Sequence, residues 1–131
     1  MKLQRALVTV AALAFLGLGI SFLFWPVEMA GYVDIQLPTS MAKTDLRATY
    51  GGFEWGFGLF LLYCALKKEH LLTGLLAASV CIGGFGISRV FGILADGQPT
   101  SMMVAFVAIE LTSSAVMGGL YMQAKGSKKR K

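Results

Sequence analysis

Five ionisable or hydroxyl-bearing residues interrupt long apolar stretches and are the candidates for chemistry. They are Arg47, Tyr50, Glu54, Arg89 and Glu110. An arginine stays ionised, and its planar guanidinium can bind a carboxylate through two hydrogen bonds. We therefore expect Arg89 to pair with Glu54 or Glu110. Tyr50 lies three residues after Arg47 and four before Glu54, which places all three on one face of a helix.

Asp45 and Asp96 flank these residues and are expected to form the rim of the site, where either can pair with Arg47. Metal chemistry is not expected, because the single histidine, His70, has no companion ligands nearby in the sequence. No motif for a cofactor is present. Cys64 and Cys81 are expected at depths about 10 Å apart, which is too far for a disulfide, so both are interpreted as packing residues.

The elements that must position these residues are apolar helices. The chain of 131 residues is 56% apolar and only 15% charged, and a soluble domain normally carries about a quarter charged residues. A helix needs about 20 apolar residues to span a membrane. Four stretches meet this requirement, at residues 6–25, 46–66, 71–94 and 100–123. The sequence therefore predicts a single all-α membrane domain, 1–131, folded as an antiparallel four-helix bundle. A signal peptide at the N-terminus is the alternative for the first stretch.

The basic residues predict the orientation of these helices. The N-terminus, the link after residue 66 and the C-terminal tail together hold nine of the twelve Lys and Arg residues. Basic loops stay in the cytoplasm, so both termini are expected there. The basic tail, Lys125, Lys128, Lys129, Arg130 and Lys131, is interpreted as lying near lipid headgroups. Nucleic acid is therefore not an expected partner.

With this topology the charged residues fall at similar depth in the outer half of the membrane. At 1.5 Å per residue, Glu54 lies about 10 Å below the outer end of its helix, and Arg89 about 8 Å. Glu110 lies about 13 Å down. We expect a polar pocket that opens outward beneath the loop 26–44. A sealed network that only orders the helices is the alternative.

Small residues are expected to bring the second and third helices together. Gly52 and Gly56 form a G-x-x-x-G pattern, and Gly84, Ser88 and Gly92 repeat the spacing in the third helix. In lipid, such residues let two helix backbones approach closely. A link of four residues joins these two helices, so they are expected to pack against each other.

The stretch "DLRATYGGFEWGFGLFLL" resembles the signature of a small bacterial family of four-span membrane proteins of unknown function. The shared positions are Asp45, Arg47, Ala48, Tyr50, Gly51 and Gly52, then Gly86, Arg89, Asp96, Gly97 and Pro99, and finally Glu110. The chain is more distantly similar to small four-span families of the DoxX type, some of which are linked to quinone or thiol redox chemistry. This chain lacks the paired cysteines that thiol redox chemistry would favour. The resemblance implies a bacterial inner membrane and brings no known activity.

Three functions remain open from the sequence. The first is a binding or accessory subunit, whose charged residues bind a lipid headgroup, a small anion or a helix of a partner protein. The second is an enzyme or redox component that acts on a lipid-soluble substrate such as a quinone, with Glu54 or Glu110 relaying protons. The third is a small transporter, which needs an oligomer because four helices leave little room for alternating access.

Overall fold

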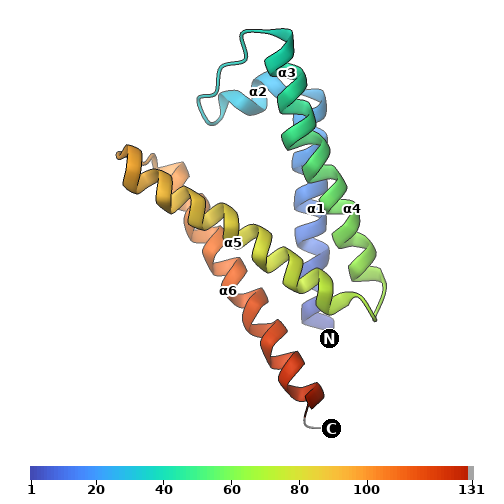
Figure 1. Ribbon diagram of the computed structural model, residues 1–131. Helices are drawn as coiled ribbons and strands as arrows, with labels where there is room; N and C mark the ends of the chain where they lie inside the picture. The colour runs from blue at the N-terminus through green and yellow to red at the C-terminus, as the bar shows by residue number, and fades with distance from the viewer. Residues whose placement is uncertain (130–131) are drawn as a thin grey trace.

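The computed structural model describes residues 1–129 and is built from helices connected by short segments (Figure 1). The elements are α1 (Lys2–Phe24), α2 (Pro26–Gly31), α3 (Ser40–Leu46), the π-helix η1 (Arg47–Gly52), α4 (Phe53–Leu66), α5 (Leu71–Asp96) and α6 (Ser101–Lys129). Residues 1–129 contain no strand, so the predicted all-α class is confirmed. Arg130 and Lys131 of the basic tail lie outside the described residues.

Local signals explain most helix ends. α1 ends at Phe24, Trp25 separates the two helices, and Pro26 begins α2 as a proline at the first helical turn. The Thr39 hydroxyl accepts a hydrogen bond of 3.1 Å from the Ala42 amide and caps α3. The helix predicted to begin at residue 46 therefore begins six residues earlier. Gly97, with φ of +75°, follows α5, and the Thr100 hydroxyl accepts a hydrogen bond from the Met103 amide at the start of α6.

α3, η1 and α4 form one continuous helical rod from residue 40 to residue 66. The junction residues Leu46 and Gly52 both have helical backbone angles, and the Phe53 amide donates a hydrogen bond to the carbonyl of Ala48, five residues earlier. Such a turn inserts one extra residue into the helix. The buried positions of the rod are Leu46, Gly51, Glu54, Gly58, Leu61, Cys64 and Ala65. Because the first step along this stripe is five residues long, Leu46 faces inward where an uninterrupted α-helix would turn Arg47 inward.

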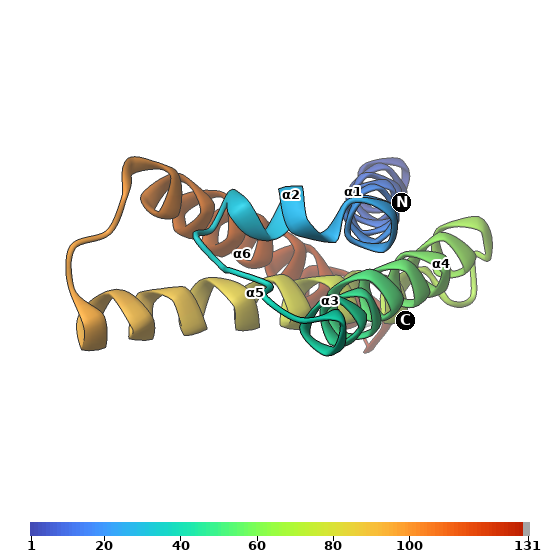
Figure 2. The ribbon, with the colours of Figure 1, turned by 90° about the horizontal axis from the view of Figure 1, so that it is seen from above.

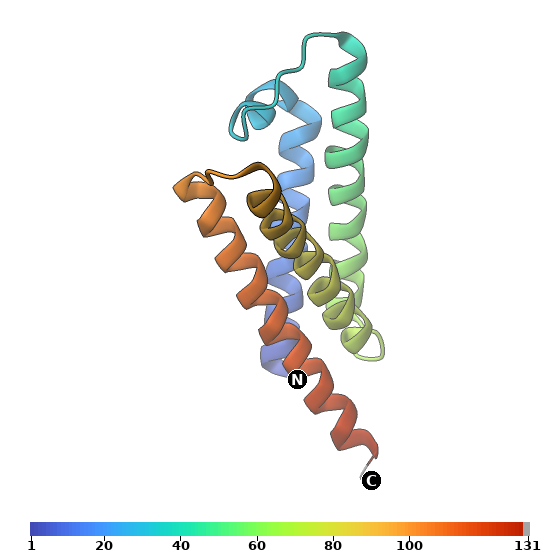
Figure 3. The same ribbon diagram turned by 60° about the vertical axis from the view of Figure 1, so that its left-hand side comes forward.

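The rods are arranged as two antiparallel hairpins. α1 pairs with the rod 40–66, and α5 pairs with α6 (Figures 1 and 3). The hairpins meet at the end that holds the N-terminus and the 67–70 link, here called the joined end. They diverge toward the opposite end, the open end (Figure 1). Seen from above, α5 and α6 extend away from α1 and α4, and α2 lies on the side toward which they diverge (Figure 2). The helices therefore do not pack as a closed bundle along their whole length.

The main core lies where the two hairpins meet. All four long helical segments contribute to it, through Val8, Ala11, Ala12, Phe15, Leu61, Ala65, Leu71, Leu75, Ala78 and Met117. A smaller cluster of Phe22, Ala30 and Leu46 holds α2 against α1 and α3. α5 has no buried residue after Gly86, and Phe91 and Leu94 are 72% and 80% exposed. The α5–α6 hairpin thus exposes apolar side chains toward the open end, as a surface in contact with lipid does.

The glycines that bring helices together differ from those expected. A Cβ at Gly58 would lie 2.8 Å from the backbone nitrogen of Leu16 on α1, and one at Gly51 would lie 2.9 Å from the Leu23 side chain. A Cβ at Gly56 would meet nothing within 4 Å, and the same holds for Gly84 and Gly92. The prediction that Gly52 and Gly56 pack the second helix against the third is therefore wrong. Helical phase explains the error, because the rod turns its small residues toward α1 rather than α5.

Three helices are long and apolar enough to cross a membrane. They cover Lys2–Phe24, Leu71–Asp96 and Ser101–Ser127. This agrees with the predicted membrane location of the chain.

Candidate functional site

Arg89 and Glu110 form the only ion pair among the described side chains. The Nε of Arg89 donates hydrogen bonds of 3.0 Å to both carboxylate oxygens of Glu110. The guanidinium also lies 5.1 Å from the centre of the Phe106 ring, and one of its terminal nitrogens lies 3.6 Å from the Met103 sulfur. The two side chains are 30% and 16% exposed. One α6 face thus surrounds the Arg89 cation with an anion, a ring and a sulfur.

Small residues in α5 make this pairing possible. A Cβ at Gly86 would lie 2.8 Å from Leu111 and 3.2 Å from the Cβ of Glu110, so α6 passes close to α5 just below the ion pair. Further toward the joined end, the hydroxyls of Ser79 and Ser114 each donate a 2.8 Å hydrogen bond to the other residue's carbonyl oxygen. These two reciprocal hydrogen bonds fix the register of α5 against α6. Ser79 was not identified from the sequence.

Glu54 lies in a different environment from Glu110. Its side chain is 6% exposed, and its Oε2 atom is buried without a hydrogen-bond partner among the described residues. One turn deeper in the rod, Phe57 packs edge-on against Phe15 of α1 at 4.9 Å. Glu54 is therefore buried, one turn from the aromatic contact between α1 and the rod.

Arg47 and Tyr50 pack against the open end of α1. The Nε of Arg47 donates a 3.0 Å hydrogen bond to the carbonyl oxygen of Leu23, and the Tyr50 ring lies 5.0 Å from that of Phe22. Both residues are exposed. Within the described side chains, Arg47 forms no ion pair with the expected rim residues Asp45 and Asp96.

The five predicted site residues thus form two groups rather than one ion-paired cluster. Arg47, Tyr50 and Glu54 belong to the first hairpin, and Arg89 and Glu110 belong to the second. Of the two partners considered for Arg89, the structure selects Glu110. The divergence of the hairpins at the open end explains why Glu54 does not share the arginine.

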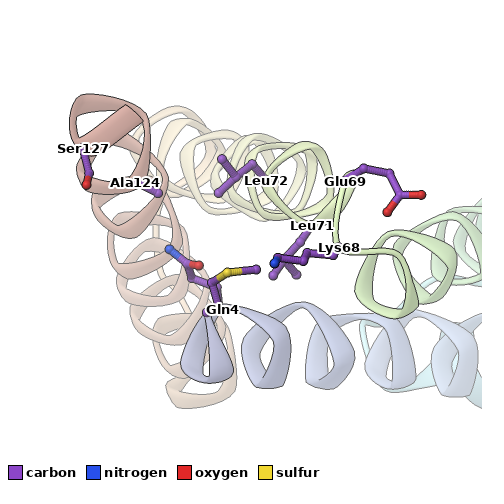
Figure 4. A pocket seen from close by; sticks show the side chains of 8 residues that line it. Gln4, Lys68, Glu69, Leu71, Leu72, Ala124 and Ser127 are labelled. Carbon is purple, nitrogen blue, oxygen red and sulfur yellow. The ribbon is translucent and has the colours of Figure 1, made fainter. Parts of the chain in front are cut away.

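A cavity of about 550 Å³ lies at the joined end, where sequence reasoning expected no site. Its lining residues are Met1, Gln4, Lys68, Glu69, Leu71, Leu72, Ala124 and Ser127 (Figure 4). They come from α1, the 67–70 link, the start of α5 and the end of α6. The available signal was the recurrence of basic residues at the N-terminus, in the link and in the C-terminal tail, which the sequence analysis used only for topology.

The described residues contain no group of three His, Cys, Asp or Glu side chains that could hold a metal ion. Cys64 and Cys81 are both free thiols. His70 stacks on Tyr63, with ring centres 5.3 Å apart.

The chain belongs to the family described as a domain of unknown function, DUF4345, which it matches over residues 3–121. This confirms the resemblance to a family of unknown function. Neither a curated protein nor a solved structure shows significant similarity to the chain.

Proposed function

We propose that this DUF4345 protein is a four-span protein of the bacterial inner membrane with both termini in the cytoplasm. The fourth crossing is the rod 40–66, of which residues 46–66 extend over about 30 Å, the thickness of the hydrocarbon core. The continuity of the rod through η1 supports this assignment. The joined end, with its basic residues, then faces the cytoplasm.

Within that topology, the proposed function is that of a binding subunit whose ligand meets Glu54. The observation that carries the proposal is the buried Oε2 atom without a partner. A buried polar atom that makes no hydrogen bond costs about 1–3 kcal/mol of stability. In membrane helices, ionisable residues are functional candidates by default. Because the buried Glu54 oxygen makes no hydrogen bond within the described residues, we expect it to bind a ligand.

The chemistry of the ligand follows from that of the carboxylate. Carboxylates accept hydrogen bonds, so the ligand presents a hydroxyl, amide or amine group at Glu54. The aromatic side chains one turn along the rod, Phe57 and its partner Phe15, favour a lipid-soluble body, such as that of an amphiphile. Tyr50 lies one turn closer to the open end and carries a further hydroxyl.

The Arg89–Glu110 pair is assigned a structural role in this proposal. Both charges already have partners, and breaking such a pair would leave an uncompensated charge in the apolar layer. Its position between α5 and α6, beside the close contact at Gly86, suits a fastening of the second hairpin.

A quinone-linked enzyme is the second candidate, and one observation favours it. Rings from three helices lie together, and one of them, Phe57, is one helical turn from Glu54: Phe15 is 4.9 Å from Phe57 and 6.4 Å from Phe85. A flat aromatic ligand can stack on such rings while a carboxyl group exchanges its proton. The two candidates therefore share Glu54 and differ in the ligand.

Mass spectrometry of co-purified small molecules tests both candidates. Protein with its lipid shell is extracted from membranes as wild type, Glu54→Gln and Glu28→Gln, the last being a matched change at an exposed glutamate of α2. We expect one lipid-soluble species to be enriched with wild type and with Glu28→Gln, and to be lost with Glu54→Gln. A hydroxyl- or amine-bearing amphiphile supports the binding subunit, and a quinone supports the enzyme. Equal retention by Glu54→Gln would contradict the assignment of Glu54.

A further inference from the structure

The cavity at the joined end combines a cationic wall and an apolar wall. Three segments that are distant in the sequence form it, namely residues 1–4, residues 68–72 of the link and the start of α5, and the end of α6. Its volume of about 550 Å³ lies within the range of ligand sites in proteins. Gln4, Lys68 and Ser127 provide hydrogen-bond donors, and Leu71, Leu72 and Ala124 provide apolar contacts.

Lys68 is the basic side chain among the residues that line this cavity. Its side chain extends from the link toward Gln4, whereas Glu69 points away to the other side (Figure 4). No carboxylate of the described side chains lies within 4.0 Å of the Lys68 ammonium group. A lysine that faces a concave site without a protein counter-ion favours an anionic ligand.

Gln4 and Ser127 complete the polar side. The Gln4 amide nitrogen donates a long hydrogen bond of 3.5 Å to the carbonyl oxygen of Leu120, which uses one of its two hydrogens. The second hydrogen and the Ser127 hydroxyl are donors suited to the oxygens of a phosphate. Lysine recognises phosphate as a point charge, and these neutral donors add direction.

The apolar side separates a lipid from a soluble anion. Leu71 is 1% exposed and anchors the floor of the cavity in the core, and Leu72 and Ala124 border it on α5 and α6. A free phosphate gains nothing from contact with an apolar wall, whereas the first methylene groups of an acyl chain are stabilised when such a wall removes them from water. Around the cavity, Lys2, Arg5, Lys67 and Lys125 raise the local positive potential, which attracts anionic lipids.

We propose that this cavity is a binding site for an anionic phospholipid, with the headgroup phosphate at Lys68, Gln4 and Ser127 and the glycerol end of its acyl chains against Leu72 and Ala124. The site is distinct from that proposed at Glu54 and does not depend on it. Basic pockets between helices at the cytoplasmic face are suited to such headgroups.

Thermal unfolding of the full chain in a neutral detergent tests the site. The probes are phosphatidylglycerol, phosphatidylcholine and glycerol 3-phosphate, each titrated against wild type, Lys68→Gln and Lys67→Gln. Lys67 is the matched control, because it is adjacent, carries the same charge and does not line the cavity. A further variant, Ala124→Trp, fills the apolar side while it leaves every charge in place.

We expect phosphatidylglycerol alone to raise the unfolding temperature of wild type. Lys68→Gln should weaken this binding about fivefold, Ala124→Trp should abolish it, and Lys67→Gln should change it less than twofold. If Lys67→Gln and Lys68→Gln weaken phosphatidylglycerol binding equally, the lipid is attracted by the basic surface as a whole, and the proposal of a specific site is wrong. If glycerol 3-phosphate binds and still binds to Ala124→Trp, the cavity recognises phosphate but not an acyl chain, and the proposal of a phospholipid ligand is wrong. If Lys68→Gln fails to fold, the Ala124→Trp comparison decides.

Discussion

Arg89 donates from a single nitrogen to both carboxylate oxygens of Glu110, at 3.0 Å each, across the two helices of the second hairpin. The contact joins residues 21 positions apart and closes the hairpin near its open end. Glu54, the other acid considered for this arginine, is left buried without a hydrogen-bond partner on Oε2. The carboxylate of Glu110 is thus satisfied by the protein, whereas that of Glu54 keeps one oxygen without a partner among the described residues.

The ion pair leads to a prediction about stability. Arg89→Met should lower the free energy of unfolding by about 3 kcal/mol, because it leaves the Glu110 charge without a partner in an apolar layer. Adding Glu110→Gln should recover a large part of the loss, and adding Glu54→Gln instead should not. Thermal unfolding of the four proteins in one detergent measures this. Full stability of Arg89→Met would show that the pair does not hold the hairpin.

The close approach of α1 and the rod gives a prediction with an internal control. Gly58→Ala should destabilise the protein by about 1–3 kcal/mol, because the new methyl group would overlap the backbone of Leu16 and the carbonyl oxygen of Ala12. Gly56→Ala, two residues away, meets open space and should be neutral or slightly stabilising. Unfolding temperatures of the two variants provide the measurement. The opposite ranking would place the helix contact on the other face of the rod.

The buried carboxylate predicts a trade between stability and function. Glu54→Met keeps a similar volume and removes an unsatisfied polar atom, so the ligand-free protein should become more stable by about 1–3 kcal/mol. The same variant should lose the co-purifying ligand. A chemical denaturation curve and mass spectrometry of the same sample record both effects. A less stable Glu54→Met would mean that the carboxylate contributes to the fold.

The topology predicts which side of the membrane each end reaches. A reporter that fluoresces only in the cytoplasm should be bright when fused after Lys131, and it should also be bright when fused before Met1. Inserted at Ser40, in the segment before the rod, it should be dark. The basis is nine basic residues on one side against Lys43 in the opposite loops. A dark C-terminal fusion in membrane fractions that contain the protein would refute four crossings.

Glu54 and Arg89 also mark the limit of prediction for the site. The distance of Arg89 from the end of its helix could be estimated from the helical rise, but that of Glu54 could not, because its helical rod begins at Ser40 and not at residue 46. Their partners could not be predicted, because a partner depends on the angle between helices. The hairpins diverge past Gly86, and this divergence removes Arg89 from the reach of Glu54 while Gly86 admits Glu110.

The helix ends and the apolar segments were determined by the sequence itself. Pro26, Gly97 and the capping hydroxyl of Thr100 act within one turn of the chain, and hydropathy depends on composition alone. The tertiary structure decided the phase of each helix. The extra residue in η1 turns Leu46 and Gly51 toward α1 and leaves Gly56 without a neighbouring helix. No local sequence pattern predicts this π-helical turn. The tertiary structure also assembled the cavity around Lys68 from three distant segments. Each of these features depends on contacts between helices that are distant in the sequence, and such contacts form only when the whole chain is folded.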